Sequence, residues 1–281
     1  MSYFRSIFRQ ISVGNSYQVS NYGPRNNAFA VFSPSNITGL RTWLDISDSA
    51  YVTSSGGYID TITNKAAAGG NFKPTTFTTR PYLSASSINS KNSAGFDGVD
   101  DILTSSISAA SLFGYSDPPP SNQVTSFTVG VVFRPNRINA SAGSYPYSLD
   151  TVFEEGNASI VMTLGTNGSV TNRLWFDYGS TTATDYVTSS AGDLSAGRTV
   201  SAIVTMLTKS YDLYINGSYK NSVARSFNPT ATATYLAIGN TSRAGTPAKL
   251  DLCEFVVYSG SLTPSQISSL NSYFADKWGI T

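Results

Sequence analysis

From residue 40 onward the chain is a succession of short segments rich in β-forming residues, separated by turn residues. The segments are enriched in Val, Ile, Thr, Tyr and Phe, as strands are. The clearest are 126–135, 159–165, 172–179, 198–207, 210–217, 234–240 and 249–260. Asn216-Gly217 predicts a tight hairpin, because this pair adopts the positive φ angles that a two-residue loop requires. The pattern predicts an all-β fold, a mostly antiparallel sandwich of two sheets.

One helix is predicted with equal clarity, at the C-terminal end. Thr263 suits the N-cap, Pro264 suits the first helical position, and Gln266 completes the spacing of a capping box. An apolar stripe then runs to a C-cap glycine at 279 and consists of Ile267, Leu270, Phe274 and Trp278. We expect this helix to pack on the sandwich and close the domain.

The first 39 residues differ from the rest in charge and pattern. Four arginines precede the first acidic residue, Asp45, although the whole chain has a net charge of only +1; they are Arg5, Arg9, Arg25 and Arg41. A short amphipathic helix is predicted, too short to be stable without a partner surface. Its residues are Phe4, Arg5, Ile7, Phe8, Arg9 and Ile11. Residues 14–36 are typical of an extended linker, so we divide the chain into an anchoring arm with linker, 1–39, and a sandwich domain, 40–281.

The composition excludes several classes of site. The chain has no histidine, which excludes Ser-His-Asp and Cys-His catalysis and His-bearing zinc sites. Its single cysteine, Cys253, lies in an apolar run and is predicted to be a buried, unreactive thiol. Eighteen basic and seventeen acidic residues give no charge footprint for nucleic acid. Without a signal-peptide pattern or a membrane-spanning apolar run, we expect synthesis in the cytoplasm.

A set of segments, taken in order, carries a resemblance to a known family. They are 40–52 (LRTWLDISDSAYV), 80–83 (RPYL), 94–103 (AGFDGVDDIL), 211–220, 234–240 and 252–280. Together they resemble the laminin-G-like branch of the concanavalin A-like lectin/glucanase superfamily over residues 40–281. The resemblance implies a jelly roll of two curved antiparallel sheets. Modules of this group serve adhesion, glycan binding, or virion and phage-tail architecture.

The FDGVDD segment has two interpretations. In the first, Asp97-Gly98 turns the chain, Val99 faces inward, and Asp100 and Asp101 stay in solvent. In the second, the carboxylates of Asp97, Asp100 and Asp101 hold a calcium ion through hard oxygen ligands. We favour the plain turn because the spaced ligands of an EF-hand-like loop are missing, and we expect no other cofactor.

Two segments offer aromatic residues for glycan binding. Strand alternation in 172–179 places Arg173, Trp175 and Asp177 on one face, where the indole could stack on a sugar ring flanked by hydrogen-bonding groups. Tyr145 and Tyr147 add aromatic rings on a predicted loop. The alternatives are an exposed sheet face with a cross-strand ion pair and an ordinary connection.

The resemblance also extends to glucanases, whose catalytic strand carries acidic residues that alternate along one face. Such alternation places a nucleophile and an acid about 5–5.5 Å apart. Here Glu154 and Glu155 are neighbours, so on a strand they would point to opposite faces. Glu254 alternates with Leu252 and Val256, neither of which is acidic. We therefore expect no enzymatic activity.

These observations predict a non-enzymatic structural protein of a virion, in a capsid, vertex or tail appendage of a phage or large DNA virus. The arm would bind other virion proteins, and the sandwich would display a surface to host glycans. The alternative is a free-standing carbohydrate-binding or adhesion module, and a glycan hydrolase is least favoured. A homo-oligomer, by analogy with trimeric viral fibres, is compatible with the residues but not required by them.

Overall fold

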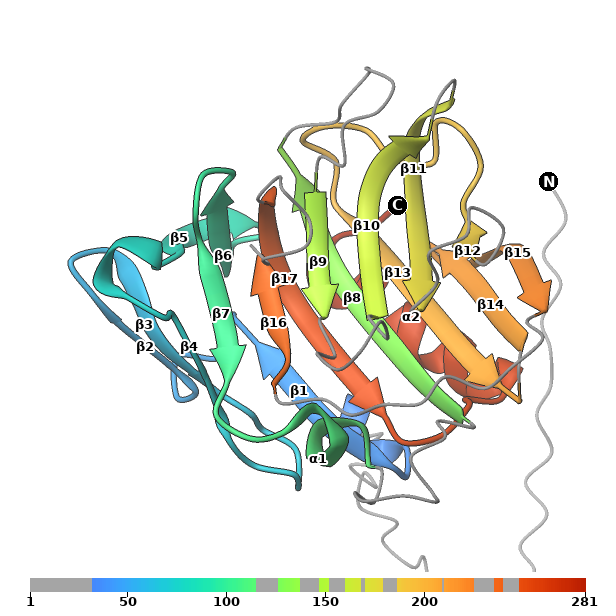
Figure 1. The fold of residues 1–281 in the computed structure, drawn as a ribbon, viewed down its shortest axis with the longest axis horizontal. Helices are drawn as coiled ribbons and strands as arrows, with labels where there is room; N and C mark the ends of the chain where they lie inside the picture. Colours follow the sequence, from blue (N-terminus) through green and yellow to red (C-terminus); the bar gives the residue numbers. More distant parts are fainter. Residues whose placement is uncertain are drawn as a thin grey trace, which may run out of the picture. The chain divides into compact units, whose positions relative to one another are not determined.

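Two antiparallel sheets face each other in the computed structural model (Figure 1). The structure describes residues 32–114, 126–136, 147–151, 160–167, 170–178, 186–208, 210–224, 235–239 and 248–281. The predicted anchoring residues Phe4, Arg5, Ile7, Phe8, Arg9 and Ile11 lie outside these ranges. Among the described residues, no helix is both long and apolar enough to cross a bilayer.

The first sheet has the strand order β1–β17–β8–β13–β14–β15. Its strands are β1 (Leu40–Asp45), β17 (Lys249–Tyr258), β8 (Ser126–Pro135), β13 (Val200–Leu207), β14 (Ser210–Ile215) and β15 (Ser218–Ala224). Where β1 ends, β6 (Lys91–Asp97) takes its place beside the first residues of β17, and β5 (Tyr82–Ile88) pairs with β6. The predicted hairpin joins β14 to β15, with φ of 48° at Asn216 and 79° at Gly217.

The second sheet has the order β4–β7–β16–β9–β10–β11–β12. Its strands are β4 (Asn71–Lys73), β7 (Ile102–Ser105), β16 (Ala237–Gly239), β9 (Tyr147–Thr151), β10 (Ile160–Asn167), β11 (Val170–Tyr178) and β12 (Tyr186–Thr188). At one end β2 (Val52–Ser55) pairs with β3 (Tyr58–Thr63), which pairs with both β4 and β5 and so links the two layers. The predicted all-β jelly roll is confirmed.

The core lies between the sheets, and strand alternation builds it. In β8 the side chains of Val129, Val131 and Phe133 are fully buried against the second sheet. Val132, between them, points to the other face and is also fully buried. A strand buried on both faces requires a third layer over it. That layer is the C-terminal helix.

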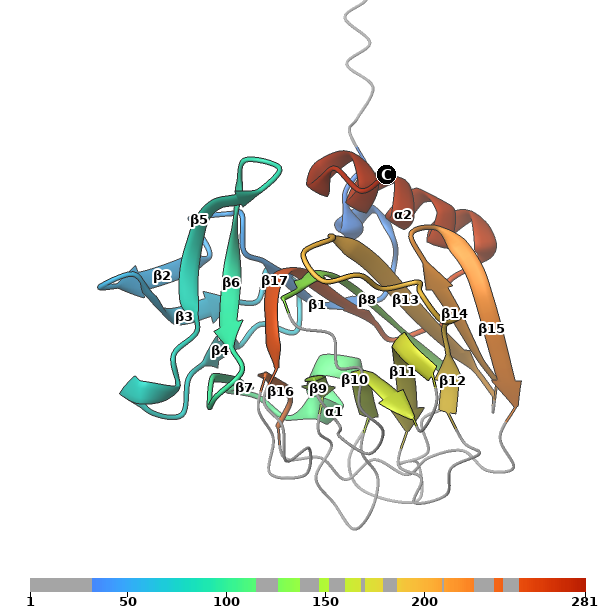
Figure 2. The same cartoon turned by 90° about the horizontal axis from the view of Figure 1, so that it is seen from above.

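The helix α2 (Pro264–Trp278) covers the outer face of the first sheet, as Figure 2 shows. Its predicted capping box is confirmed, because the Thr263 hydroxyl accepts from the Gln266 N–H and Gln266 Oε1 accepts from the Thr263 N–H at 2.9 Å. The predicted stripe is buried against Val132, Ile203, Val256 and Tyr258. Gly130 allows the close approach, since a Cβ there would lie 2.9 Å from the Val256 side chain and 3.3 Å from Phe274. These contacts confirm that the helix packs on the sandwich and closes the domain.

Three shorter helices accompany the strands among the described residues. They are η1 (Pro34–Asn36), η2 (Phe77–Thr79) and α1 (Ala109–Phe113). Residues 32–39, the last part of the predicted arm and linker, contact the sandwich: the Tyr258 hydroxyl donates to the Pro34 carbonyl at 3.1 Å, and Ile37 is buried. Phe32 packs on Tyr273 of α2, with ring centroids 6.1 Å apart. The division of the chain at residue 39 stays a prediction.

Candidate functional site

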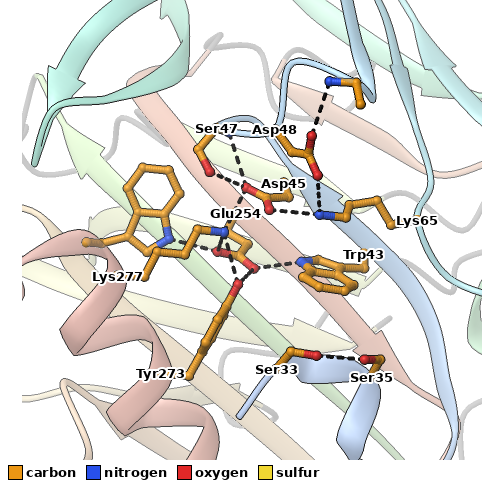
Figure 3. Close-up of polar contacts among 12 residues, drawn as sticks. Ser33, Ser35, Trp43, Asp45, Ser47, Asp48, Lys65, Glu254, Tyr273 and Lys277 are labelled. Carbon is orange, nitrogen blue, oxygen red and sulfur yellow. Dashed lines mark hydrogen bonds and ion pairs between the residues drawn. The ribbon is translucent and has the colours of Figure 1, made fainter. Parts of the chain in front are cut away.

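Glu254 lies at the centre of a buried polar network between α2 and the outer face of β1 and β17 (Figure 3). Its Oε1 accepts from Trp43 Nε1 at 2.6 Å and from the Tyr273 hydroxyl at 2.9 Å. Its Oε2 accepts from Trp278 Nε1 at 2.8 Å and pairs with Lys277 Nζ at 2.9 Å. Burial raises the pKa of Glu254, although the Lys277 ammonium opposes the shift. Four donors thus satisfy a carboxylate that has no access to solvent.

A second carboxylate, Asp45, lies directly opposite Glu254 in the β1–β17 pair. Two acids in this position repel each other. Lys277 Nζ offsets the repulsion, since it lies 2.8 Å from Asp45 Oδ1 as well as 2.9 Å from Glu254 Oε2. Lys65 Nζ lies 3.0 Å from Asp45 Oδ2 and 2.7 Å from Asp48. Burial alone would raise the pKa of Asp45, but Lys277, the Ser47 hydroxyl and Lys65 outweigh it and hold that pKa below its ordinary value.

The two carboxylates of the Glu254 network are enclosed by other protein groups. The space between its two carboxylates is filled by Lys277, and α2 covers the pair from solvent. A glycosidase pair needs room for a sugar between its carboxyl groups. The network has the connectivity of a buried ion-pair cluster that fixes α2 on the sheet.

The turn after β6 brings together the three predicted metal ligands. One carboxylate oxygen each of Asp97, Asp100 and Asp101 lies within 4.8 Å of the others. Asp97 Oδ1 accepts from the Val99 N–H, and Asp101 Oδ2 accepts from the Asp97 N–H, both at 2.7 Å. These two hydrogen bonds are compatible with a plain turn. The calcium interpretation stays a prediction.

Two side-chain placements predicted for this turn are wrong. Val99 is 67% exposed, because it occupies the tip of a turn in which Gly98 has a φ of 83°. Asp101 is buried, because its carboxylate folds back onto the Asp97 N–H. Burial, together with the charges of Asp97 and Asp100, raises the pKa of Asp101 to about 7.

The predicted glycan residues of β11 are only partly within the described side chains. Leu174 and Phe176 are buried in the core, as the predicted alternation requires. Arg173 is half-buried, and its Nε finds no acceptor among the described residues. The backbones of Trp175 and Asp177 pair with β10, but their side chains lie outside the described set.

The two loop tyrosines have different outcomes. Tyr147 is the first residue of β9 and pairs with Leu164 of β10, so its placement on a loop is wrong. The reason is that β9 begins within a Ser- and Tyr-rich segment that shows no apolar alternation. Tyr145 lies outside the described residues, as do Glu154 and Glu155.

Cys253 agrees with its prediction. The thiol is completely buried under α2, and burial raises its pKa well above the ordinary value. A thiol of this kind is a weak nucleophile.

A row of directly opposed residues crosses five strands on the same outer face, outside the area covered by α2. Tyr58 of β3 opposes Tyr82 of β5, and Tyr82 opposes Gly95 of β6. Gly95 in turn opposes Asp251 of β17, which opposes Arg134 of β8. The ring of Tyr82 lies across Gly95, where a Cβ would collide with it. Tyr58 is 46% and Tyr82 37% exposed.

Phe77 of η2 extends this exposed aromatic surface. Its side chain is 77% exposed. The Arg80 guanidinium lies 3.7 Å from the Phe77 ring centroid and 5.1 Å from that of Tyr58. Arg80 is fixed by Asp60 Oδ1 at 2.7 Å and by the Phe77 carbonyl at 3.1 Å. We name Tyr58, Phe77, Arg80 and Tyr82 the Tyr82 shelf.

Sequence reasoning missed the Tyr82 shelf. Its residues come from three elements, and their contact depends on strand register that no local pattern reveals. The only signal was the RPYL segment, which contributed to the family resemblance without suggesting a site.

A groove also runs between the start of α2 and the hairpin of β13 and β14. It has a volume of about 450 Å³ and is lined by Thr205, Leu207, Tyr214, Leu262 and Ile267, among others. Leu207 at its rim is 60% exposed. Of the residues predicted to bind glycan, Arg173 has a described side chain, and it does not line this groove.

Comparison with known proteins identifies the family to which this fold belongs. A laminin G family model, described as the concanavalin A-like lectin/glucanases superfamily, matches residues 114–268. A comparison with curated protein sequences gave no match.

Several solved structures share the fold at low sequence identity. The binding domain of botulinum neurotoxin serotype D aligns with a TM-score of 0.55 and 10% identity, covering 84% of this chain and 51% of that chain. The binding domain of botulinum neurotoxin DC, in complex with rat synaptotagmin II, aligns at 0.56 and 12%, covering 84% and 51%. A mutant of a GH54 α-L-arabinofuranosidase aligns at 0.56 and 12%, covering 79% and 51%. The present chain therefore spans about half the length of these proteins, and the likeness concerns the fold alone.

Proposed function

This chain belongs to the concanavalin A-like lectin/glucanases superfamily, and from that premise we propose that it is a non-enzymatic structural protein of a virion that presents a glycan-binding surface. In this proposal residues 1–39 anchor the chain to other virion proteins in a capsid, vertex or tail appendage. The protein is made in the host cytoplasm, and the sandwich faces host glycans.

The observation that carries the non-enzymatic part is the use of the buried carboxylates. Glu254 and Asp45 share Lys277 beneath α2. Asp251 accepts from Arg134 Nε at 3.0 Å and from Asn136 Nδ2 at 2.8 Å. Each of these groups is engaged by the fold itself, which supports recognition rather than hydrolysis as the task of the described surface.

The binding part is supported by the exposed aromatic rings of the Tyr82 shelf and by analogy of fold. Two of the similar structures are toxin binding domains, one of them in complex with synaptotagmin. A third is a glycosidase, so the fold by itself is compatible with both uses.

Anchoring is tested in the full chain by replacing Phe4, Ile7 and Phe8 together with Ser. The variant should keep the thermal midpoint of the unaltered protein and fail to incorporate into purified particles, because the apolar face of the arm is lost. Deletion of residues 1–31 preserves the contacts of Phe32 and Pro34 and serves as the second variant. Normal incorporation of both variants would overturn the anchoring role.

Glycan binding is tested with the full chain on a glycan array. Binding without any particle association would favour the free-standing carbohydrate-binding module, the second candidate. Hydrolysis of an array glycan that is lost in Glu154→Gln or Glu155→Gln would replace the proposal by a glycosidase.

A further inference from the structure

We propose that the Tyr82 shelf is a binding platform for a neutral pyranose oligosaccharide, with one sugar ring stacked on Tyr82. The inference rests on the proposed glycan-binding function and names the site and the ligand class that serve it.

The first support is the way in which the Tyr82 ring is held. Position 95 must be glycine for the Tyr82 ring to lie directly on the neighbouring strand, because any Cβ there would collide with the ring. One face of the ring is thereby packed, while the side chain remains 37% exposed. A flat aromatic ring with one free face matches the apolar C–H face of a pyranose, and a ring that is already fixed loses little entropy on binding.

The second support is the extent of the aromatic surface. Tyr58 lies directly opposite Tyr82 across the β3–β5 pair, and neighbours of this kind share one face of a sheet. Phe77 adds a third ring, with the Arg80 guanidinium between it and Tyr58. Three rings held by three elements suit an oligosaccharide better than a single sugar.

The third support is charge. Arg80 pairs with Asp60 at 2.7 Å, and Arg134 pairs with Asp251 at 2.8 Å. Both cations near the shelf are therefore already neutralised and are poor partners for the carboxylate of a sialic or uronic acid.

Polar groups beside the ring can orient the sugar. Ser84 lies two residues along β5 on the same face, where its hydroxyl hydrogen-bonds the Tyr82 hydroxyl and lies 3.5 Å from Asp251 Oδ1. Asn136 is exposed and donates to Asp251 through Nδ2, and among the described residues its side-chain oxygen accepts no hydrogen bond. A few polar groups around an aromatic surface are what sugar hydroxyls require.

The test measures sugar binding by the full chain with isothermal titration calorimetry. The probes are cellotetraose, chitotetraose and galactotetraose, with tetragalacturonate as the anionic counterpart. We expect at least one neutral tetrasaccharide to bind more tightly than tetragalacturonate. Tyr82→Ala should weaken that binding at least tenfold, whereas Tyr82→Phe, which keeps the ring, should stay within about twofold.

Further variants separate loss of the ring from loss of folding. Phe77→Ala removes a largely exposed side chain and should weaken tetrasaccharide binding without changing the thermal midpoint. Gly95→Ala should weaken binding by displacing the ring of Tyr82. Tyr219→Ala is the matched control, since Tyr219 is 56% exposed on β15, away from the shelf, and its removal should leave binding unchanged.

The outcomes against the proposal are distinct. Neutral-sugar binding that persists in Tyr82→Ala and Phe77→Ala overturns the shelf but leaves the proposed function intact. Tighter binding of tetragalacturonate overturns the ligand class. Self-association of the unaltered chain that Tyr82→Ala abolishes in sedimentation would make the shelf an interface between copies and overturn the proposal. The absence of binding to every probe and to the glycan array removes the glycan function altogether.

Discussion

The outer face of the first sheet has two parts that contain the same kinds of side chain with opposite exposure. Under α2, indole and phenol groups surround the fully buried Glu254. On the uncovered part, the phenol rings of Tyr58 and Tyr82 remain partly exposed, in the same cross-strand row as the Arg134–Asp251 pair. The comparison shows that the same kinds of aromatic and charged group are sealed from solvent where a helix covers them and stay partly exposed where none does.

The difference has an energetic basis. Removing one partner from a buried ion pair leaves an uncompensated charge, which costs far more than the loss of a partly exposed pair. Substitutions under α2 should therefore change stability, and substitutions on the shelf should change binding.

The largest effect is expected for Glu254→Ala. The substitution leaves the Lys277 ammonium and two indole N–H groups without their acceptor, and we expect the free energy of unfolding to fall by about 3–5 kcal/mol. Urea denaturation followed by circular dichroism measures it. Asp276→Ala, on the exposed side of the same helix, should change the value by less than about 0.5 kcal/mol. Equal effects of the two substitutions would abolish the distinction between the covered and uncovered parts.

The second effect is a pH dependence of opposite sign at the two ends of the face. Asp101, near the shelf, has a pKa of about 7 in the folded chain and 3.8 as its ordinary value. Between these pH values the unfolded chain binds fewer protons, so the free energy of unfolding should fall as pH rises, by up to about 1.4 kcal/mol per pH unit. Asp101→Asn should remove this slope.

Asp45, under α2, should act in the other direction. Its pKa is lowered in the folded chain, so the stability it contributes is present above its ordinary pKa and is lost as the pH falls below about 4. Denaturation curves recorded from pH 3 to pH 8 would show both limbs. A stability that rises steadily from pH 4 to pH 7 and is unaffected by Asp101→Asn would contradict the burial of that carboxyl group.

A smaller effect on stability is expected at α2, the helix that covers one part of the outer face and leaves the other exposed. Thr263→Ala removes the N-cap of α2, whose hydroxyl accepts from the Gln266 N–H at 3.3 Å. We expect a loss of about 1 kcal/mol in the same denaturation experiment. Ser269→Ala, on the exposed face of α2, is the control and should not lower stability. If the Thr263 variant were as stable as the unaltered protein, packing alone would be sufficient to hold α2 on the sheet.

The smallest stability effect is expected on the shelf. Phe77→Ala removes a side chain that is 77% exposed and gives up only a cation–π contact with Arg80. The free energy of unfolding should therefore fall by only about 0.5 kcal/mol, as for other exposed contacts of this kind. Thermal melting measures it. A loss comparable with that of Glu254→Ala would mean that the shelf is part of the structural core.

Much of the fold could be predicted from local patterns. The capping box at Thr263 and the apolar stripe of α2 depend on spacing within one helix, and the Asn216-Gly217 turn depends on two residues. The placements of Val99, Asp101 and Tyr147 failed for the complementary reason. Alternation assigns a face only inside a regular strand, and these residues lie in a turn or where a strand begins without an apolar pattern.

The sites were less accessible to such reasoning. An acidic residue at the centre of the apolar run of β17 was a signal that Glu254 is buried with partners, but the partners Trp43 and Trp278 come from opposite ends of the described chain. The shelf gave no comparable signal, because its rings meet through the pairing of β3, β5 and β6.

The amino-acid sequence by itself determined the class of fold, the positions of most strands, the boundaries of the terminal helix and the exclusion of histidine chemistry. These features depend on residue types and on spacings of a few positions. Only the tertiary structure decided which outer-face residues became a sealed network and which stayed exposed. That outcome depends on strand order, register and the area that one helix can cover, and these quantities arise from contacts between residues far apart in the chain.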